Sequence, residues 1–499
     1  MRTLLYIGIS LLPVFGIAST FHVTATGSDV NNGLAIATAW GTLQHAADVA
    51  VAGDTVLVHD GAFQGFAAMD HSGTEEDPIV FMTQEDGGGV LIDQPCAYNN
   101  LDGINVENVA WVVIDGFEVN GMPRTGIRTV LSDHVTLRGN ACSGNVKWGI
   151  LTGFAEHCTI EYNVCSYSAD EHGIYFGNSA DDPIIRFNYC FNNNANGIHM
   201  NGDESQGGDG IISNAQVYGN VIYENGAAGG SGINCDGVIN SVFYNNLLYQ
   251  NHASGISLYR IDGGAPSTGN RVYNNIIVNA PDARWCINIT DGCSGNQLLN
   301  NILINEHPTR GSIVVAADAL DGFVSDYDLV TPRLSADGDA TILDLPAWQA
   351  LGYDAHSQIA ASEASLFGPV YYPAGPTAQM VDAGTAAVAD VVTVDLGGVA
   401  RPIGTGYDIG VYEYPLSTGF ATIKEAMNGV RITPTGYLFP NTAYGDVLQV
   451  LDAQGRVVLA QRITSTPHTV AFGVLPPGVC FFRLLGQSGS VKESGMLLR

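Results

Sequence analysis

A short apolar motif with a shared asparagine recurs along the middle of the chain, and this repeat constrains the fold more than any other feature. Two of its copies read "CTIEYNVC" and "SVFYNNLL". The shared asparagines are Asn140, Asn163, Asn188, Asn220, Asn246, Asn275 and Asn301. They lie 23 to 32 residues apart, which is the length of one coil in a solenoid whose repeats stack on each other.

A second motif, which reads "GIYFG" and "GIHMN" in two of its copies, also occurs once in each repeat. Its copies begin at Gly126, Gly149, Gly173, Gly197, Gly232 and Gly255, and Cys286 takes the glycine position in the next copy. Apolar residues alternate with a period of two in both motifs, which predicts short strands. We expect the asparagines to form a structural ladder, because Asn tolerates left-handed turns and can stack its amides.

The inward positions of the first motif hold Ile and Leu in most copies and Cys142, Cys165 and Cys190 in three of them. A free cysteine packs as a small apolar residue. We therefore expect buried thiols at these three positions and not disulfides.

Together the two motifs resemble the right-handed parallel β-helix of the pectate-lyase-like superfamily over roughly residues 75 to 330. The resemblance implies an all-β fold. It does not select an activity, because this fold supports lyases, hydrolases, epimerases and adhesive surfaces.

The segments on both sides of the repeat agree with this resemblance, and we expect the β-helix domain to span residues 19–415. Residues 21–63 look like the opening segment of such proteins, with an amphipathic helix near Leu43 to Val51 that would cap the first coil. Residues 394–415 look like the closing segment, and we expect Arg401, Asp408 and Glu413 to form a structural ion-pair cluster there.

Residues 421–499 differ in character and resemble the C-terminal sorting domain of type IX secretion, a small β-sandwich. The predicted hairpin at Gly455-Arg456 and the turn at Pro477-Gly478 match that family. Cys480 stands where the family usually has Tyr or Phe, and Phe439-Pro440-Asn441 replaces an early Asn-Pro pair. The resemblance implies the secretion machinery as a partner and a location outside the cell or on its outer surface.

Residues 1–18 read as a signal peptide, with Arg2 before an apolar run that Pro13 interrupts. No comparable apolar segment follows, so we expect no transmembrane segment after its removal. The formal charge of −30 argues against binding to nucleic acid or to an anionic membrane. We expect the mature protein to be a monomer.

Outward-facing residues of the second motif form the candidate site. Alternation places the first outward stripe at Arg128, Leu151, Tyr175, His199, Asn234, Ser257 and Asn288. A second stripe, two residues further along each strand, contains Asn201, Asp236 and Tyr259. Because coils stack about 4.8 Å apart, these side chains form a polar, aromatic patch that suits a linear polysaccharide.

The patch contains groups for β-elimination on a uronide, which needs a base, an acid and neutralisation of the substrate carboxylate. We predict His199 as the base, Tyr175 or Tyr259 as the acid and Arg260 as a neutralising group, with Asp236 as a further catalytic residue. The predicted substrate-binding residues are His172, Asn201, Asn234, Ser257, Tyr259 and Asn288.

A long acidic loop follows His199, and its Asp203, Glu204 and Asp209 could bind Ca²⁺ together with Asp236. We expect no organic cofactor. A bound Ca²⁺ could neutralise the substrate carboxylate in place of Arg260.

Two other functions remain open. A glycoside hydrolase needs two carboxylates, for which Asp236 with Asp203 or Asp209 are the candidates. A carbohydrate-binding or adhesive surface would need no catalysis. β-Helix lyases often use Lys or Arg as the base, and the sequence does not place Lys147 on the outward stripe.

Overall fold

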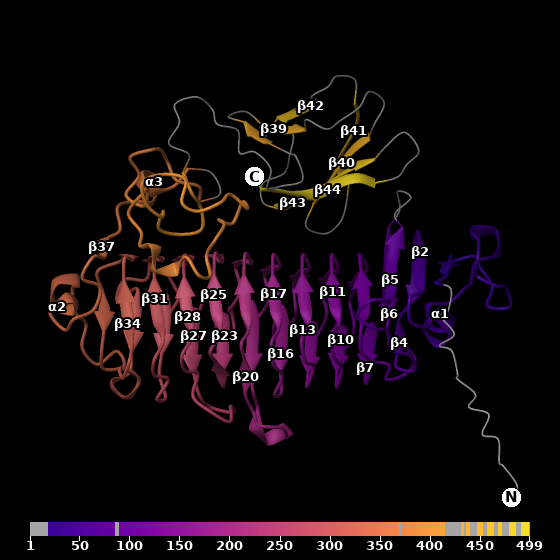
Figure 1. The fold of residues 1–499 in the computed structure, drawn as a ribbon, viewed down its shortest axis with the longest axis horizontal. Coiled ribbons are helices and arrows are strands. Elements are labelled where there is room, and N and C mark those ends of the chain that lie inside the picture. The colour runs from indigo at the N-terminus through magenta and orange to yellow at the C-terminus, as the bar shows by residue number, and fades with distance from the viewer. Residues whose placement is uncertain are drawn as a thin grey trace, which may run out of the picture.

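The computed structural model describes residues 18–84, 89–368 and 371–414, together with strand segments between residues 431 and 498. The main body is a right-handed parallel β-helix of about 12 turns. Figure 1 shows its strands stacked along the long axis, from α1 at the N-terminal end to α2 at the other. The all-β fold class and the parallel β-helix that the sequence predicted are therefore confirmed.

Three parallel sheets run the length of the β-helix, and each complete coil contributes one strand to each sheet. Sheet I consists of β1 (Thr20–Val23), β2 (Thr55–His59), β5 (Ile79–Gln84), β8 (Val112–Asp115), β11 (Thr136–Arg138), β14 (Thr159–Glu161), β17 (Ile184–Arg186), β21 (Gln216–Tyr218), β25 (Val242–Tyr244), β28 (Arg271–Tyr273), β31 (Gln297–Leu299) and β34 (Val324–Asp326).

Sheet II contains the second sequence motif. It consists of β4 (Phe66–Ala68), β7 (Ile104–Glu107), β10 (Thr125–Val130), β13 (Trp148–Gly153), β16 (Ile174–Gly177), β19 (Ile198–Asn201), β23 (Ser231–Asp236), β27 (Ser254–Tyr259), β30 (Ile287–Ile289), β33 (Ile313–Val315) and β36 (Leu334–Ser335).

Sheet III follows the asparagine column. It consists of β3 (Gly61–Gln64), β6 (Val90–Gln94), β9 (Glu118–Asn120), β12 (Ala141–Ser143), β15 (Val164–Ser166), β18 (Tyr189–Phe191), β22 (Val221–Tyr223), β26 (Leu247–Tyr249), β29 (Ile276–Asn279), β32 (Ile302–Asn305), β35 (Leu329–Val330) and β37 (Gln358–Ile359). A separate pair, β20 (Ile212–Ser213) and β24 (Val238–Ile239), joins two loops beside the coils.

Stacked apolar columns fill the interior of the β-helix, because alternate residues of each short strand point inward. Cys142, Cys165 and Cys190 lie in one such column and pair in register with Val119 before them and Ile222 after them. All three thiols are buried and free, as the sequence predicted.

The predicted asparagine ladder is present between sheets I and III. The side-chain amide of Asn163 donates to Oδ1 of Asn188 at 3.0 Å, and the amide of Asn188 donates to Oδ1 of Asn220 at 3.0 Å. The same contact links each predicted asparagine to the next and ends on Oδ1 of Asp328. All seven asparagines are buried.

Short helices occur outside the sheets. They are α1 (Leu43–Val49), α2 (Leu345–Gln349), α3 (Glu363–Leu366) and the 3₁₀ turns η1 (Ile36–Thr38), η2 (Glu204–Gln206), η3 (Ala317–Ala319) and η5 (Ala386–Val388). Helix α1 begins at Thr42, whose side chain accepts a hydrogen bond from the backbone N–H of His45. A helix therefore lies where the sequence predicted one, and its role as a cap of the first coil stays a prediction.

The closing segment corrects one detail of the predicted ion-pair cluster. The guanidinium of Arg401 pairs with Glu413 at 2.8 Å, and both side chains are buried. Arg401 meets Asp408 only through the backbone carbonyl of that residue, at 3.0 Å. The Asp408 carboxylate instead accepts from the backbone N–H groups of Asp382 and Tyr414, and these two donors satisfy its oxygens without the guanidinium.

The described strands near the C-terminus are antiparallel, unlike those of the β-helix. They are β38 (Arg431–Thr433), β39 (Gly436–Phe439), β40 (Val447–Asp452), β41 (Val457–Arg462), β42 (His468–Ala471), β43 (Val479–Leu485) and β44 (Val491–Leu498). Phe439 packs against Phe482 within a small apolar cluster of these strands. The sorting domain and the domain boundaries stay predictions, and the predicted signal peptide, the Gly455-Arg456 hairpin and the Pro477-Gly478 turn lie outside the described residues.

None of the helices in the described part of the chain has the length and apolar character needed to span a bilayer.

Candidate functional site

The parallel register of sheet II brings the predicted stripes together. Tyr175 pairs with His199, His199 with Asn234, and Asn234 with Ser257 on the neighbouring strands β16, β19, β23 and β27. The second stripe is in register too, since Asn201 pairs with Asp236 and Asp236 with Tyr259. Ser257 pairs in turn with Asn288 on β30.

Three of these side chains form a hydrogen-bonded series that we name the His–Tyr chain: His172, His199 and Tyr259. Nε2 of His172 lies 3.0 Å from Nδ1 of His199, and Nε2 of His199 lies 3.4 Å from the Tyr259 hydroxyl. The series crosses several coils, because His172 comes just before β16 and Tyr259 ends β27.

The surroundings of His172 fix the direction of the protons in this chain. Its Nδ1 faces the backbone N–H of Asn196 at 3.3 Å, and that group can only donate. Neutral His172 therefore carries its proton on Nε2 and donates to Nδ1 of His199. Neutral His199 in turn carries its proton on Nε2 and donates to the Tyr259 oxygen.

Asn234 provides a second donor to the Tyr259 hydroxyl. Its side-chain amide lies 2.7 Å from that oxygen, and its Oδ1 accepts from Ser231 at 3.1 Å, which orients the amide. Ser231 also contacts the buried Ser257 hydroxyl at 2.8 Å. Because Tyr259 receives hydrogen bonds from both Asn234 and His199, its own proton is available to a bound molecule.

Tyr175 lies beside the His–Tyr chain and repeats this pattern in a simpler form. The Asn201 amide donates to its hydroxyl at 3.1 Å. The ring of Tyr175 contacts His199 at 5.2 Å between centroids and stacks on Trp148 at 5.4 Å. Oδ1 of Asn201 is buried and has no hydrogen-bond partner among the described residues.

Burial shifts the pKa values of these groups so that all of them stay uncharged near neutral pH. Desolvation lowers the pKa of His172 to about 3, with a smaller contribution from the charge of Lys147. Desolvation and the neighbouring His172 lower the pKa of His199 well below its ordinary value. Desolvation also raises the pKa of Tyr259 and of Tyr175.

Two predicted catalytic residues point into a loop instead of toward the histidines. The buried Asp236 carboxylate accepts from the backbone N–H groups of Ile261, Asp262 and Gly263 at 2.8 to 3.1 Å. The Arg260 guanidinium donates to the carbonyls of Gly263 and Gly264 at 3.0 and 3.4 Å. Both side chains therefore hold the loop after β27 in place.

The loop after β27 is hydrogen-bonded to the long acidic loop that follows β19. The backbone N–H of Glu204 donates to the Asp262 carbonyl at 2.9 Å, and the N–H of Gly264 donates to the Gly210 carbonyl at 2.7 Å. Figure 1 shows the excursion that leads into β20 extending outward from the coils. The Asp262 carboxylate has a raised pKa, through desolvation and the charges of Asp236 and Asp203, and also interacts with Asn201.

The predicted Ca²⁺ ligands offer hard oxygen donors but are not gathered around one point. Asp203 caps η2 by accepting from Ser205, and Asp209 accepts from the backbone N–H of Ile211 at 3.0 Å. Within the described ranges, the group of metal-ligating side chains with atoms within 4.8 Å of one another lies elsewhere, at Asp133, His134 and His157. Ca²⁺ binding by the acidic loop stays a prediction.

Lys147 lies closer to the His–Tyr chain than the sequence suggested. Its ammonium group pairs with Glu171 at 2.7 Å, and the same carboxylate accepts from the Trp148 indole at 2.9 Å. Glu171 also lies 3.7 Å from Nε2 of His172. The sequence placed His172 at the rim of the patch, and the structure brings it into direct contact with His199.

Sequence reasoning missed a third column at this surface, the residue before each glycine of the second motif. It holds Trp148, His172, Asn196 and Ser231, and only His172 was singled out. Strict alternation would point this position inward, but alternation is interrupted at the glycine, because a Cβ on Gly173 would itself face the interior, 3.2 Å from Cβ of Cys190. A Cβ on Gly173 would lie 2.8 Å from the carbonyl oxygen of Gly197 in the next coil, so only glycine fits there. The recurrence of polar and aromatic residues before glycine was the available signal.

Comparison with known proteins supports the fold. A family model described as periplasmic copper-binding protein (NosD) matches residues 83–312. No curated protein matches the sequence. The chain is similar to the solved structure of pectate lyase Pel9A, with 14% identity, a TM-score of 0.54 and coverage of 80% of this chain and 97% of that chain.

Two further solved structures are more distant. The match to an alginate lyase from Paenibacillus sp. str. FPU-7 has 19% identity and a TM-score of 0.42. It covers 59% of this chain and 97% of that chain. The match to a rhamnogalacturonan lyase has 12% identity and a TM-score of 0.45. It covers 70% of this chain and 90% of that chain. The likeness to pectate lyase Pel9A shows that this chain shares the parallel β-helix fold of that protein.

Proposed function

We propose that the protein is an exported polysaccharide lyase that cleaves a uronide-containing chain by β-elimination on the outer face of sheet II. The proposal rests on the environment of the Tyr259 hydroxyl. This hydroxyl receives two hydrogen bonds, has a raised pKa and keeps a proton that it can donate. The fold shared with a pectate lyase supports the choice of this chemistry over the alternatives.

Tyr259 is the proposed acid, which protonates the leaving glycosidic oxygen. The phenolate that forms would be stabilised by the Asn234 amide and by Nε2–H of His199, because both already point at this oxygen. His199 then acts as a positioning residue. It is not free to serve as the base, since one ring nitrogen accepts from His172 and the other donates to Tyr259.

Asp262 is the proposed base that removes the C5 proton. Its carboxylate is exposed, and its charge acts on both Tyr175 and Tyr259. Its raised pKa makes it a stronger base than an ordinary aspartate. Tyr175, Asn201 and Asn288 would contact the sugar residues on either side of the cleaved bond.

The raised pKa of Asp262 also favours a second candidate function, glycoside hydrolysis. A carboxylic acid with a raised pKa is better able to donate to the leaving oxygen, while a second carboxylate such as Asp203 serves as its partner. The two reactions differ in their products, so one assay separates them.

The test incubates the mature full-length protein with pectate, alginate and neutral glycans, each with and without added Ca²⁺. β-Elimination creates an unsaturated uronide that absorbs in the near ultraviolet, and this signal on a polyuronide is the expected result. New reducing ends without the absorbance would assign hydrolysis. Retention of a glycan without cleavage would assign a binding surface, and dependence on Ca²⁺ would support the predicted metal ligands Asp203, Glu204 and Asp209.

A further inference from the structure

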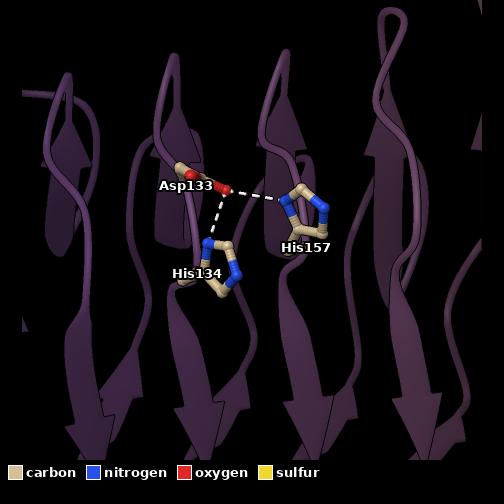
Figure 2. A group of neighbouring side chains, drawn as sticks. All are labelled: Asp133, His134 and His157. Atoms are coloured by element: carbon tan, nitrogen blue, oxygen red, sulfur yellow. Dashed lines mark hydrogen bonds and ion pairs between the residues drawn. The ribbon is translucent and has the colours of Figure 1, made fainter. Parts of the chain in front are cut away.

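A cluster of three metal-ligating side chains lies at a corner of the β-helix, away from the His–Tyr chain. Asp133 and His134 belong to the turn between β10 and β11, and His157 belongs to the turn between β13 and β14. The turns are stacked in register, since Asp133 bridges to Glu156 of the next coil. Figure 2 shows both imidazole rings directed at the Asp133 carboxylate.

The three ligand atoms converge. Nδ1 of His134 lies 2.8 Å from Oδ1 of Asp133, and Nδ1 of His157 lies 2.9 Å from the same oxygen. We propose that Asp133, His134 and His157 bind a divalent transition-metal ion, with Cu(II) as the ion that fits them best.

The types of donor atom indicate which ion would bind here. Two imidazole nitrogens and one carboxylate suit Cu(II), Ni(II) and Zn(II) better than Ca²⁺ or Mg²⁺. The three ligand atoms lie within 4.8 Å of one another, close enough to reach one ion. Among the divalent ions that such a donor set suits, Cu(II) binds most tightly in the Irving–Williams order.

The backbone and the ring stack hold the ligands in this arrangement. His134 and His157 have φ values of 52° and 51°, the left-handed conformation that recurs at this corner of each coil. Their rings stack at 4.4 Å, and the Trp111 ring stacks on His134 at 3.9 Å. The stack and the backbone therefore keep the two imidazoles beside each other and beside Asp133.

The site is open to solvent and carries negative charge. The side chains of Asp133, His134 and His157 are 47%, 31% and 46% exposed. A further carboxylate, that of Asp182, lies 3.8 Å from Nε2 of His157. On binding, the ion would displace the proton in the hydrogen bond between Nδ1 of His157 and Asp133, and this proton would pass to solvent.

The chain contains a matched cluster with one imidazole fewer. At Asp326, Tyr327 and His356 the carboxylate again contacts a histidine of the next coil, at 2.7 Å, and an aromatic ring stacks on that histidine at 4.6 Å. Tyr327 stands in the place of His134. This cluster separates the effect of the second imidazole from that of an exposed His–Asp pair.

The experiment titrates the metal-free full-length protein with Cu(II), Ni(II), Zn(II) and Ca²⁺ by calorimetry, and records the electron paramagnetic resonance of the Cu(II) sample. We expect one tight Cu(II) site with two nitrogen ligands, weaker Zn(II) binding and no competition from Ca²⁺. His134→Gln and His157→Gln should each weaken this site about 10- to 100-fold, while His356→Gln should leave it unchanged.

A second readout is the fluorescence of Trp111. A paramagnetic ion bound beside His134 would quench this fluorescence. The quenching should disappear in Trp111→Phe without a change in affinity. The proposal is wrong if the His134→Gln/His157→Gln double variant, checked for folding by circular dichroism, retains the tight site. It is equally wrong if the Cu(II) spectrum is the same in that variant. Neither readout depends on polysaccharide cleavage.

Discussion

The Tyr259 hydroxyl shows how single side chains define this site. Its oxygen is surrounded by donors, because Asn234 is oriented by Ser231 and His199 is oriented by His172. The orientation of His172 depends on Asn196, whose backbone N–H and side-chain nitrogen both face Nδ1 of the ring. The chemistry at the surface therefore rests on groups that never touch the substrate.

Replacing Tyr259 removes the proposed proton donor and leaves the surrounding packing in place. We expect Tyr259→Phe to lower kcat about 100-fold or more, since a positioned acid contributes about 10²- to 10⁴-fold. KM should change little. The measurement is the initial rate of product formation on the best polyuronide, with Tyr244→Phe in sheet I as the control. A rate close to that of the parent protein would remove Tyr259 from the mechanism.

Acid should destabilise the protein through His172. Free histidine takes up a proton below about pH 6.5, whereas folded His172 has a pKa of about 3. Between these values the unfolded chain binds the additional proton, so the free energy of unfolding falls by about 1.4 kcal/mol per pH unit as the pH decreases. Urea unfolding from pH 7 to 4 should show a shallower slope in His172→Gln. An unchanged slope would mean that His172 is protonated in the folded protein.

At the scale of strands and turns, the asparagine ladder ties each coil to the next. Asn188 accepts from the backbone N–H and the amide of Asn163, and donates to Asn220 and to the Ile160 carbonyl. All these groups are buried, so a group that loses its partner cannot form a hydrogen bond to water in its place. The ladder stabilises the turns that lead from sheet I to sheet III.

Asn188→Ala should therefore be costly. It leaves several buried donors and acceptors without partners, and each such group costs about 1 to 3 kcal/mol. We expect a clear drop in thermal stability by circular dichroism. Asn194→Ala is the control, because its side chain makes one 3.3 Å hydrogen bond near the surface. Equal stability of the two variants would show that the ladder contributes little.

The elements also show what the sequence could predict. A period of two fixed the inward and outward positions of the strands, and the register of β16, β19, β23 and β27 followed from it. The residues before each glycine were missed because alternation is interrupted at the glycine. The register of Asp236 followed from the period. The direction of the Asp236 and Arg260 side chains depends on loop contacts that no period encodes.

At the scale of the whole molecule, charge opposes the proposed substrate. The chain has a formal charge of −30, and Glu204, Asp209 and Asp262 are exposed beside the site. A polyuronide approaching this surface meets repulsion that extends over about one Debye length, roughly 10 Å at 0.1 M salt. Neutral glycans would not experience this barrier.

Raising the NaCl concentration from low to physiological ionic strength should therefore increase kcat/KM on a polyuronide several-fold, because screening weakens repulsion between like charges. The measurement is the initial rate at substrate concentrations far below KM. A neutral glycan serves as the comparison and should show no such increase. A fall in kcat/KM with salt on the polyuronide would indicate a local positive surface, such as one around Lys147, as the dominant contact.

The ladder has one more consequence, which concerns how such a protein changes length during evolution. Each asparagine accepts from the coil before it and donates to the coil after it, until Oδ1 of Asp328 receives the last amide. A duplicated coil inserted between two of these asparagines finds an acceptor on one side and a donor on the other. Whole coils can thus be gained or lost in the middle of the molecule without breaking the ladder, whereas a change at either end removes a neighbour that the ladder needs.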